Sequence, residues 1–221
     1  NAGVGIVETY SYFEKQYLKL LAAFNNHYAK KCDTAVSISQ FLADVLKKET
    51  GVVSSVEHIP IDASRFHPKV SGAAVRKKYG LTKPVLLYVG RISPHKGVHL
   101  LLKAFAEIQK KVDCHLLIVG KGTFSSYMRR LKKMAGKNVT FAGFVPDALL
   151  GAYYGACDVY VTGTLWEGFD MPLAEANACG KDAVAFEVGA HKEVLKNGKL
   201  VAKGDVDAFA KAVVEILNGK K

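Results

Sequence analysis

From residue 84 onward the chain alternates between short apolar runs and longer segments with apolar residues at helical spacing. The apolar runs predict strands and the longer segments predict helices. The expected strand and helix pairs are 85–89 with 97–111, 115–119 with 124–135, 139–142 with 146–156, 158–162 with 172–179, 183–186 with 191–195, and 200–202 with 206–217. Repeated strand–helix units of this length predict an α/β fold with a Rossmann-like, doubly wound parallel sheet.

The pattern before residue 67 is less complete. Residues 7–31 carry aromatic and aliphatic side chains at helical spacing, and residues 34–38 and 56–61 are short apolar runs. A helix is expected from Ser39 to Lys48, with a glycine after it to end the unit. We therefore expect an incomplete α/β segment at 1–66, a connector near 61–68, and one whole domain at 67–221.

Composition narrows the kinds of molecule that this protein is expected to bind. The 221 residues are 49% hydrophobic and carry 31 basic against 20 acidic side chains, a net charge of +11. Such a balance suits nucleic acid, anionic membranes or phosphorylated small molecules. The charge is spread over helices, as in 129–133, and a solvated helix face is the simpler interpretation, so we predict no nucleic-acid partner.

The cysteines and the apolar runs bear on location. The four cysteines lie far apart, without a C-x-x-C pair, and predict buried, reduced thiols in a cytoplasmic chain. No apolar run has membrane-spanning length and no signal peptide is recognisable at the start. An interfacial helix remains open, and residues 13–21 are its only candidate.

The stretch 163–180 carries the strongest chemical signal. It follows an apolar strand, breaks at Gly168 and enters a helix at Pro172. Two carboxylates, Glu167 and Glu175, stand across this turn, where parallel sheets bind ligands and a helix N-terminus favours an anion. Taken singly, Glu167 is more simply a solvated loop charge and Glu175 a partner of the helix dipole. Together they suit a sugar attached to a phosphate.

A second signal is the basic loop 89–97, after the first strand of the main domain. Gly90 permits a tight turn and close ligand approach, Arg91 offers a planar fork to phosphate oxygens, and Lys96 offers a point charge. Alone, this is also an ordinary basic loop before a helix. Gly120 begins half of a G-x-G-x-x-G fingerprint whose third glycine is replaced by Ser125, which is a weak signal.

These segments together resemble the group 1 (family 4) retaining glycosyltransferases of the GT-B fold. The run from Glu167 is similar to the family signature E-G-F-G-x-x-x-x-E-A-x-A-x-G, and 89–97 is similar to V-G-R-x-x-x-x-K-G. The resemblance extends in register from about Val36 to about Gly219. Asp170 stands where the family usually has Gly, and Asp182 where it usually has Pro. The Asn-Gly turn of the family's interdomain crossing is missing after Pro60.

The resemblance implies an enzyme that moves a sugar from a nucleotide-diphosphate sugar to a carbohydrate or lipid-linked acceptor, with retention and with neither metal nor cofactor. Glu175 would hold the ribose, Glu167 the donor sugar, and Arg91 with Lys96 the diphosphate; the last three form the implied catalytic set. For Asp170 two outcomes are open, an outward turn that caps the helix and hydrogen bonds to the donor sugar, and we expect the second. The implied donor-binding residues are Gly90, Arg91, Lys96, Gly120, Phe144, Val145, Glu167, Gly168, Phe169, Asp170, Met171 and Glu175.

The resemblance also bears on the short amino-terminal segment. Residues 1–66 are similar to the last third of the family's amino-terminal, acceptor-binding domain, so this chain alone is expected to be inactive. Residues 67–221 would be the donor-binding domain. The expected location is the cytoplasm, and peripheral association with the inner face of the membrane is left open.

Alternatives to this interpretation are a nucleotide-sugar epimerase, which shares the GT-B architecture without transferring sugar, and a non-catalytic nucleotide-binding module. A metal enzyme is not expected. Asp205 and Asp207 resemble a D-x-D metal pair, but a helix cap is the simpler interpretation of their place after Gly204. The seven histidines have no metal-ligand spacing.

Overall fold

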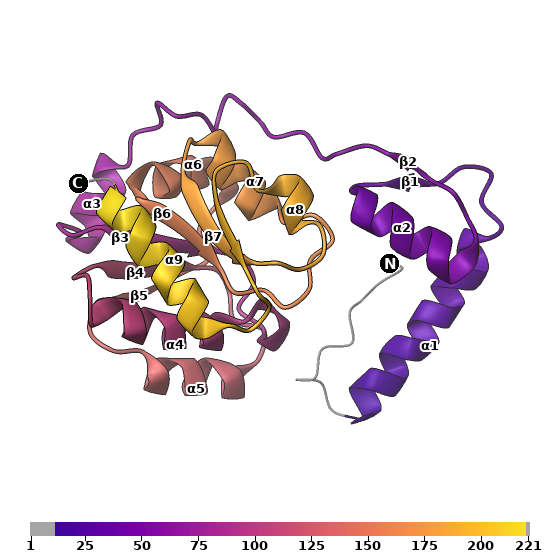
Figure 1. Ribbon diagram of the computed structural model, residues 1–221, viewed down its shortest axis with the longest axis horizontal. Coiled ribbons are helices and arrows are strands. Elements are labelled where there is room, and N and C mark those ends of the chain that lie inside the picture. The colour runs from indigo at the N-terminus through magenta and orange to yellow at the C-terminus, as the bar shows by residue number, and fades with distance from the viewer. Residues whose placement is uncertain (1–11, 220–221) are drawn as a thin grey trace.

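A six-stranded parallel sheet forms the centre of the structure. This computed structural model describes residues 12–219, and Figure 1 shows the sheet domain, a smaller amino-terminal unit and an extended connection between them. The strands lie in the order β5-β4-β3-β6-β7-β8. They are β3 (Val85–Val89), β4 (His115–Val119), β5 (Val139–Gly143), β6 (Val159–Thr162), β7 (Asp182–Phe186) and β8 (Gly198–Val201). The expected doubly wound α/β sheet is confirmed.

Helices cover both faces of this sheet. One face packs against α4 (Val98–Gln109), α5 (Ser125–Met134) and α9 (Val206–Gly219), and the other against α3 (Ala73–Tyr79), α6 (Asp147–Ala156), α7 (Met171–Ala178) and α8 (His191–Val194). Successive residues of β3 alternate between the two cores, with Leu86 and Tyr88 in the first and Leu87 in the second. Because both faces are covered, the strand is a continuous apolar run.

The order of the strands sets the place of the ligand site. From β3 the chain moves outward through β4 to β5, returns to β6 on the other side of β3, and continues through β7 to β8. The adjacent strands β3 and β6 therefore form the topological switch point, and ligands of such sheets bind at the carboxyl ends of these strands. The loops that leave there are the basic 90–97 and the acidic 163–170.

The amino-terminal unit consists of α1 (Tyr12–Ala29), β1 (Val36–Ser37), α2 (Gln40–Thr50) and β2 (Ser55–Val56). The predicted helix after Ser39 is confirmed: the Ser39 hydroxyl accepts a hydrogen bond from Leu42 N, and Gly51 ends the helix in the left-handed region. The predicted strands 34–38 and 56–61 are much shorter than expected. Ile59 and Ile61 pack their side chains against the core of the sheet domain instead of extending the pairing.

The first helix exposes much of its apolar surface. It begins at Tyr12 in the described chain, and residues 7–11 of the predicted helix lie outside the described residues. Exposed apolar side chains on α1 are Tyr12, Phe13, Tyr17, Leu20, Leu21, Phe24 and Tyr28. Within residues 12–219, no helix combines the length and the apolar character that a membrane span needs.

The structure differs from the sequence-based expectations at two further points. Helix α3, which was not predicted, has seven residues, three of them basic, and packs Val75 into the core beside α6. Such a short segment carries too few apolar positions to show a helical period. Cys32 is exposed, which contradicts the expectation that all the thiols are buried; Cys114, Cys157 and Cys179 are buried.

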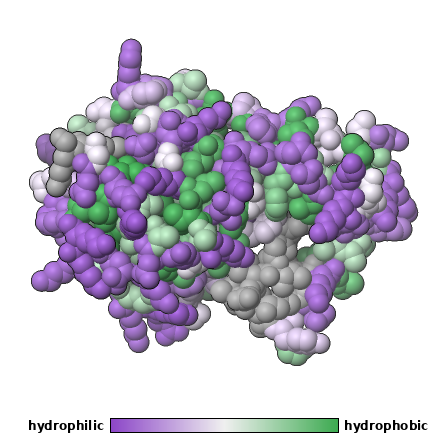
Figure 2. Space-filling model, viewed as in Figure 1, coloured by the Kyte–Doolittle hydropathy of each residue, from purple (hydrophilic) through white to green (hydrophobic). Residues whose placement is uncertain are grey.

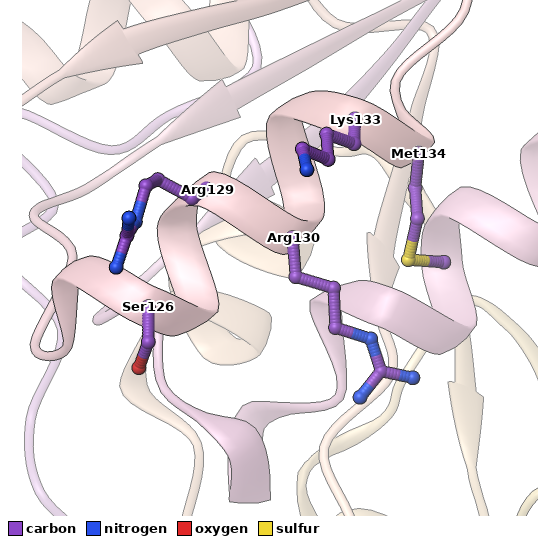
Figure 3. A pocket seen from close by; sticks show the side chains of 5 residues that line it. All are labelled: Ser126, Arg129, Arg130, Lys133 and Met134. Atoms are coloured by element: carbon purple, nitrogen blue, oxygen red, sulfur yellow. The ribbon is translucent and has the colours of Figure 1, made fainter.

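The basic run on α5 is a solvated helix face, as predicted. Arg129, Arg130, Lys132 and Lys133 are all exposed, and Figure 2 shows hydrophilic residues along the lower left of the molecule, where α5 lies in Figure 1. A surface pocket there is lined by Ser126, Arg129, Arg130, Lys133 and Met134, which all come from this one helix (Figure 3). It contains none of the predicted site residues.

Candidate functional site

Close backbone contacts hold together the loops that follow β3 and β6. Gly97 ends the short 3-10 helix Pro94–Lys96 with φ +64°, and a Cβ atom on it would lie 1.8 Å from the carbonyl oxygen of Gly163. Leu165 N donates a hydrogen bond to His95 O across the same gap, at 2.8 Å. Only glycine permits this approach. The two loops that carry the candidate residues are therefore fixed against each other.

An ion pair joins these loops at their tips. The ammonium group of Lys96 donates to Oε2 of Glu167, and the two side chains are only 17% and 16% exposed. Burial and the nearby Asp170 carboxylate raise the pKa of Glu167, and Lys96 acts in the opposite direction. The structure thus brings together two of the three residues of the implied catalytic set.

Arg91 lies on the same loop but in a different environment. Gly90, with φ +153°, turns the chain after β3, and the hydroxyl of Tyr88 donates to the carbonyl oxygen of Arg91 at 2.8 Å. This bond fixes the backbone while the Arg91 side chain is exposed. A guanidinium held in this way is open to phosphate oxygens, which it contacts through a planar fork of donors.

Glu175 lies on α7, half-buried. Its Oε2 atom accepts a hydrogen bond from the hydroxyl of the buried Tyr154, at 2.7 Å. Burial raises the pKa of Glu175, whereas the bond from Tyr154 lowers it. Nothing in the local sequence marks Tyr154, which lies on α6, as a partner of Glu175. Nothing in the sequence marks Tyr160 of β6 either; burial raises its pKa well above the usual value, and the nearby Asp170 carboxylate acts in the same direction.

Asp170 does not lie as the sequence analysis expected. It is 5% exposed, its Oδ1 atom accepts from Leu173 N at 3.2 Å, and its Oδ2 atom lies 3.0 Å from Nε2 of His191. The expectation that this carboxylate turns to the donor sugar is wrong, because both of its oxygens have partners inside the protein. Asp170 also has φ +71°, in the left-handed region that favours glycine.

The same capping corrects the expected anion site at the start of α7. The helix has eight residues, Pro172 contributes no N–H, and the Asp170 carboxylate already takes the N–H of Leu173. An internal anion thus occupies this helix end. The accessible positive charge of the site belongs to the loop after β3.

Other predicted residues line the carboxyl edge around this centre. A Cβ on Gly120 would lie 1.8 Å from the carbonyl oxygen of Gly90, so the loops after β3 and β4 also touch. Phe144 is 71% exposed and Val145 is buried, directly after β5. Gly168 and Phe169 belong to the turn between β6 and α7, where Phe169 is 7% exposed, and Met171 is the first residue of α7.

The amino-terminal unit contacts this turn directly. The Ser39 hydroxyl donates to the carbonyl oxygen of Gly168 at 2.7 Å. Glu193, on α8, accepts hydrogen bonds from the backbone amides of Gln40 at 2.7 Å and Phe41 at 2.8 Å, which form the first turn of α2. A carboxylate at a helix N-terminus is favourable. Nothing in the sequence marks these contacts, since their partners lie more than a hundred residues apart along the chain.

Side chains that could bind a metal ion do not cluster in the part of the chain that the structure describes. Within residues 12–219 no group of three or more His, Cys, Asp or Glu side chains could hold a metal ion. The cap interpretation of Asp205 is confirmed, since its Oδ1 atom accepts from Ala208 N at 2.9 Å.

Comparison with known proteins gives the family. Residues 73–221 match the family described as "Glycosyl transferases group 1". The chain belongs to this family. The motifs after β3 and β6 therefore stand in a member of this family, as the resemblance implied.

Sequence relatives of this glycosyltransferase include mannosyltransferases. It is 31% identical over 202 residues, 84% of its length, to the GDP-mannose-dependent alpha-(1-6)-phosphatidylinositol monomannoside mannosyltransferase of Mycolicibacterium smegmatis. It is 31% identical over 187 residues to the mannosylfructose-phosphate synthase of Agrobacterium fabrum, covering 77% of the chain. These matches cover 53% and 41% of the relatives, so the chain spans about half of their length.

Solved structures share the fold of this glycosyltransferase. Anabaena HepE in complex with UDP-glucose superimposes with a TM-score of 0.81 at 22% identity, over 92% of this chain and 60% of that one. Sucrose-phosphate synthase from Thermosynechococcus elongatus gives a TM-score of 0.79 at 25% identity, over 95% of this chain and 55% of that one. The Rossmann-like GT-B architecture expected from the sequence is confirmed.

Proposed function

We propose that this chain is the donor-binding half of a retaining glycosyltransferase that uses a nucleotide-diphosphate sugar. The observation that carries the proposal is the Lys96–Glu167 ion pair at the carboxyl ends of β3 and β6. It sets a cation beside a carboxylate at the switch point of the sheet, with the exposed Arg91 on the same loop. Such a site offers positive charge to a diphosphate and an acceptor to sugar hydroxyls.

The proposed roles follow from the environments of the side chains. Arg91 and Lys96 bind the diphosphate and stabilise the negative charge that grows on it as the sugar leaves. Glu167 accepts hydrogen bonds from the donor sugar, and its ion pair with Lys96 directs it. Glu175, oriented by the hydroxyl of Tyr154, accepts hydrogen bonds from the ribose. The backbone near Phe144 meets the nucleobase.

Retention is proposed to arise from reaction on one face of the sugar. The bond between the anomeric carbon and the diphosphate oxygen breaks, and the acceptor oxygen bonds to that carbon from the same side. The acceptor's hydroxyl proton passes to the departing phosphate oxygen, so no metal is needed to balance the charge. We expect transfer to proceed in excess EDTA.

The acceptor belongs to the whole protein rather than to this chain. We propose that residues 1–66 are the end of an acceptor-binding domain, that residues 67–221 are the donor domain, and that the chain alone does not transfer sugar. The relatives named above act on a phosphatidylinositol monomannoside and make mannosylfructose phosphate. A carbohydrate or lipid-linked acceptor, met in the cytoplasm at the inner face of the membrane, fits this range.

The proposed function is tested by ligand binding and by product analysis on the full-length parent protein. A melting-shift panel of GDP, GDP-mannose, UDP and UDP-glucose is expected to show stabilisation by at least one matched pair. Incubation with the stabilising nucleotide sugar and candidate acceptors should then give a glycosylated product. A free epimerised sugar would instead identify an epimerase, and binding without turnover would identify a binding module.

Replacing Arg91 with alanine is expected to weaken nucleoside diphosphate binding about tenfold or more, since a charged hydrogen bond contributes roughly 1.5–3 kcal/mol. Affinity for the nucleoside should change little. Calorimetry with both ligands measures the difference, and Arg129→Ala on the exposed face of α5 is a matched control. Equal diphosphate affinity for Arg91→Ala and the unaltered protein would refute the role of Arg91.

Replacing Glu175 with glutamine is expected to weaken ribonucleotide binding roughly tenfold through loss of the charge, by the same scale for charged hydrogen bonds. The amide oxygen of glutamine can still accept from Tyr154, so the helix should remain in place. Affinity for the 2′,3′-dideoxy nucleotide should be unchanged. If both ligands lose affinity equally, Glu175 does not contact the ribose.

A further inference from the structure

A buried acid–base pair lies behind the turn that carries Glu167. Asp170 is 5% exposed and His191 is fully buried. Their Oδ2 and Nε2 atoms are 3.0 Å apart, and the other ring nitrogen of His191, Nδ1, lies 2.6 Å from the carbonyl oxygen of Phe186 at the end of β7. Both ring nitrogens therefore face oxygen atoms.

This geometry determines how many protons the pair holds. The Phe186 carbonyl can only accept, so Nδ1 must carry a proton. A second proton must lie between Nε2 and Oδ2, because a bare ring nitrogen and a bare carboxylate would repel each other there. The pair is thus net neutral, with an imidazolium facing a carboxylate. Burial lowers the pKa of His191, but the hydrogen bond and charge of Asp170 outweigh it and leave the pKa raised.

The residues just before His191 contact the turn 167–170 at a second point. Ala190 N donates a hydrogen bond to Glu167 O at 3.2 Å. Next to it, Gly189 has φ +52°, and a Cβ there would lie 1.9 Å from the same carbonyl oxygen. Residues 189–191 therefore contact the turn at two points, through the backbone at Glu167 and through the His191 imidazole at Asp170.

These contacts stabilise Asp170, whose backbone conformation and burial are both unfavourable. A residue with a Cβ pays for φ +71°, and a carboxylate that is almost fully buried needs a proton donor. The N–H of Leu173 satisfies one oxygen and His191 satisfies the other. A glycine at this position would need neither partner.

We propose that His191 is a positioning residue of the donor-sugar site, which with Asp170 fixes the turn 167–170 so that Glu167 stays set against Lys96. This inference rests on the proposed function for its ligand readout. His191 itself need not touch the donor. Its effect reaches the donor through the Asp170 carboxylate, the start of α7 and the backbone of Glu167.

The test compares His191→Leu, Asp170→Gly and the double variant in the full-length parent protein. His191→Leu leaves a buried carboxylate without its proton donor. Asp170→Gly leaves a neutral histidine that keeps its Nδ1–H bond to Phe186, and the double variant removes both groups. The probes are GDP against GDP-mannose, and UDP against UDP-glucose, so that the sugar contribution is separated from that of the nucleotide.

His191→Leu is expected to lose roughly tenfold more affinity for the nucleotide sugar than for the nucleotide, on the scale of one hydrogen bond to a charged group. The double variant should lose no more affinity than the more severe of the two single variants, because the two residues act as one pair. Equal losses for both ligands, or single losses that add in full in the double variant, would overturn the positioning role.

Two NMR measurements keep the proposal decidable where ligand binding is absent or a variant folds poorly. In the unaltered protein at pH 7, nitrogen and carboxyl carbon shifts should show one proton shared by His191 and Asp170; a bare Nε2 beside an ionised carboxylate would overturn the pair. The NOE contacts between the Lys96 and Glu167 side chains should weaken in His191→Leu. If the unaltered protein binds neither nucleotide sugar, the proposed function fails, and these contacts then decide the positioning role, because contacts that stay unchanged would overturn it.

Discussion

Replacing Lys96 with methionine is expected to lower turnover of the full-length enzyme by roughly 100-fold or more, the usual cost of removing one preorganised charge from a transition state. Methionine keeps an unbranched apolar side chain as far as the ε position and removes the ammonium group. Glu167 then loses its partner in a setting where burial already raises its pKa. The variant should therefore fail in two ways, with weaker stabilisation of the leaving diphosphate and a less ionised Glu167.

The matched control is Lys83→Met. Lys83 also forms an ion pair, with Asp113, but its side chain is 42% exposed and it precedes β3, at the opposite edge of the sheet. Turnover should be unchanged in this variant. Steady-state kinetics on purified protein, with folding checked by circular dichroism, measures both. If Lys96→Met keeps more than a tenth of the turnover, or Lys83→Met loses as much, the assignment of the cation is wrong.

Replacing Gly97 with alanine is expected to give the largest loss of stability. The left-handed φ of +64° costs a residue with a Cβ about 1 kcal/mol. The added Cβ would lie 1.8 Å from the carbonyl oxygen of Gly163, which belongs to the backbone and cannot move aside by rotation. Overpacking of this kind costs roughly 1–3 kcal/mol more. Separation of the two loops should also draw Lys96 away from Glu167.

Gly80→Ala separates the two contributions. Gly80 has nearly the same φ, +62°, but nothing lies within 4 Å of its Cβ position. Only the conformational cost of about 1 kcal/mol is expected there. Urea unfolding of the three proteins gives the difference in the free energy of unfolding between the variants, which is the cost of the contact alone. Equal losses at Gly97 and Gly80 would show that the two loops separate at no cost.

The repeated strand–helix pattern could be predicted because each element carries its own signal. Strand β3 is buried on both faces, so its apolar run is visible in five consecutive residues, and Gly51 and Ser39 mark their helix ends by local chemistry. The strands of the small unit were overestimated because Ile59 and Ile61 are apolar for the sake of packing rather than pairing.

The candidate site could be predicted only in part, for a related reason. Arg91, Lys96 and Glu167 lie in contiguous motifs whose residue types already suggest a diphosphate sugar. The orientation of Asp170 depends on His191, which lies 21 residues later and reaches it across the end of β7. The partner of Glu175 is likewise 21 residues away, on another helix. Local composition carries no trace of such pairings, which exist only once the sheet has assembled.

The contacts of Ser39 and Glu193 have a practical consequence for anyone dividing this protein into parts. A cut near residue 67 separates the two units along the chain, but hydrogen bonds that join them cross this boundary. It would strip Gly168 O of its hydroxyl donor and leave the Glu193 carboxylate without the two amides that it caps. The turn between β6 and α7 would then lose the hydrogen bond that the amino-terminal unit donates to it. A truncated domain can thus keep its sheet and still bind a nucleotide sugar less tightly than the longer chain.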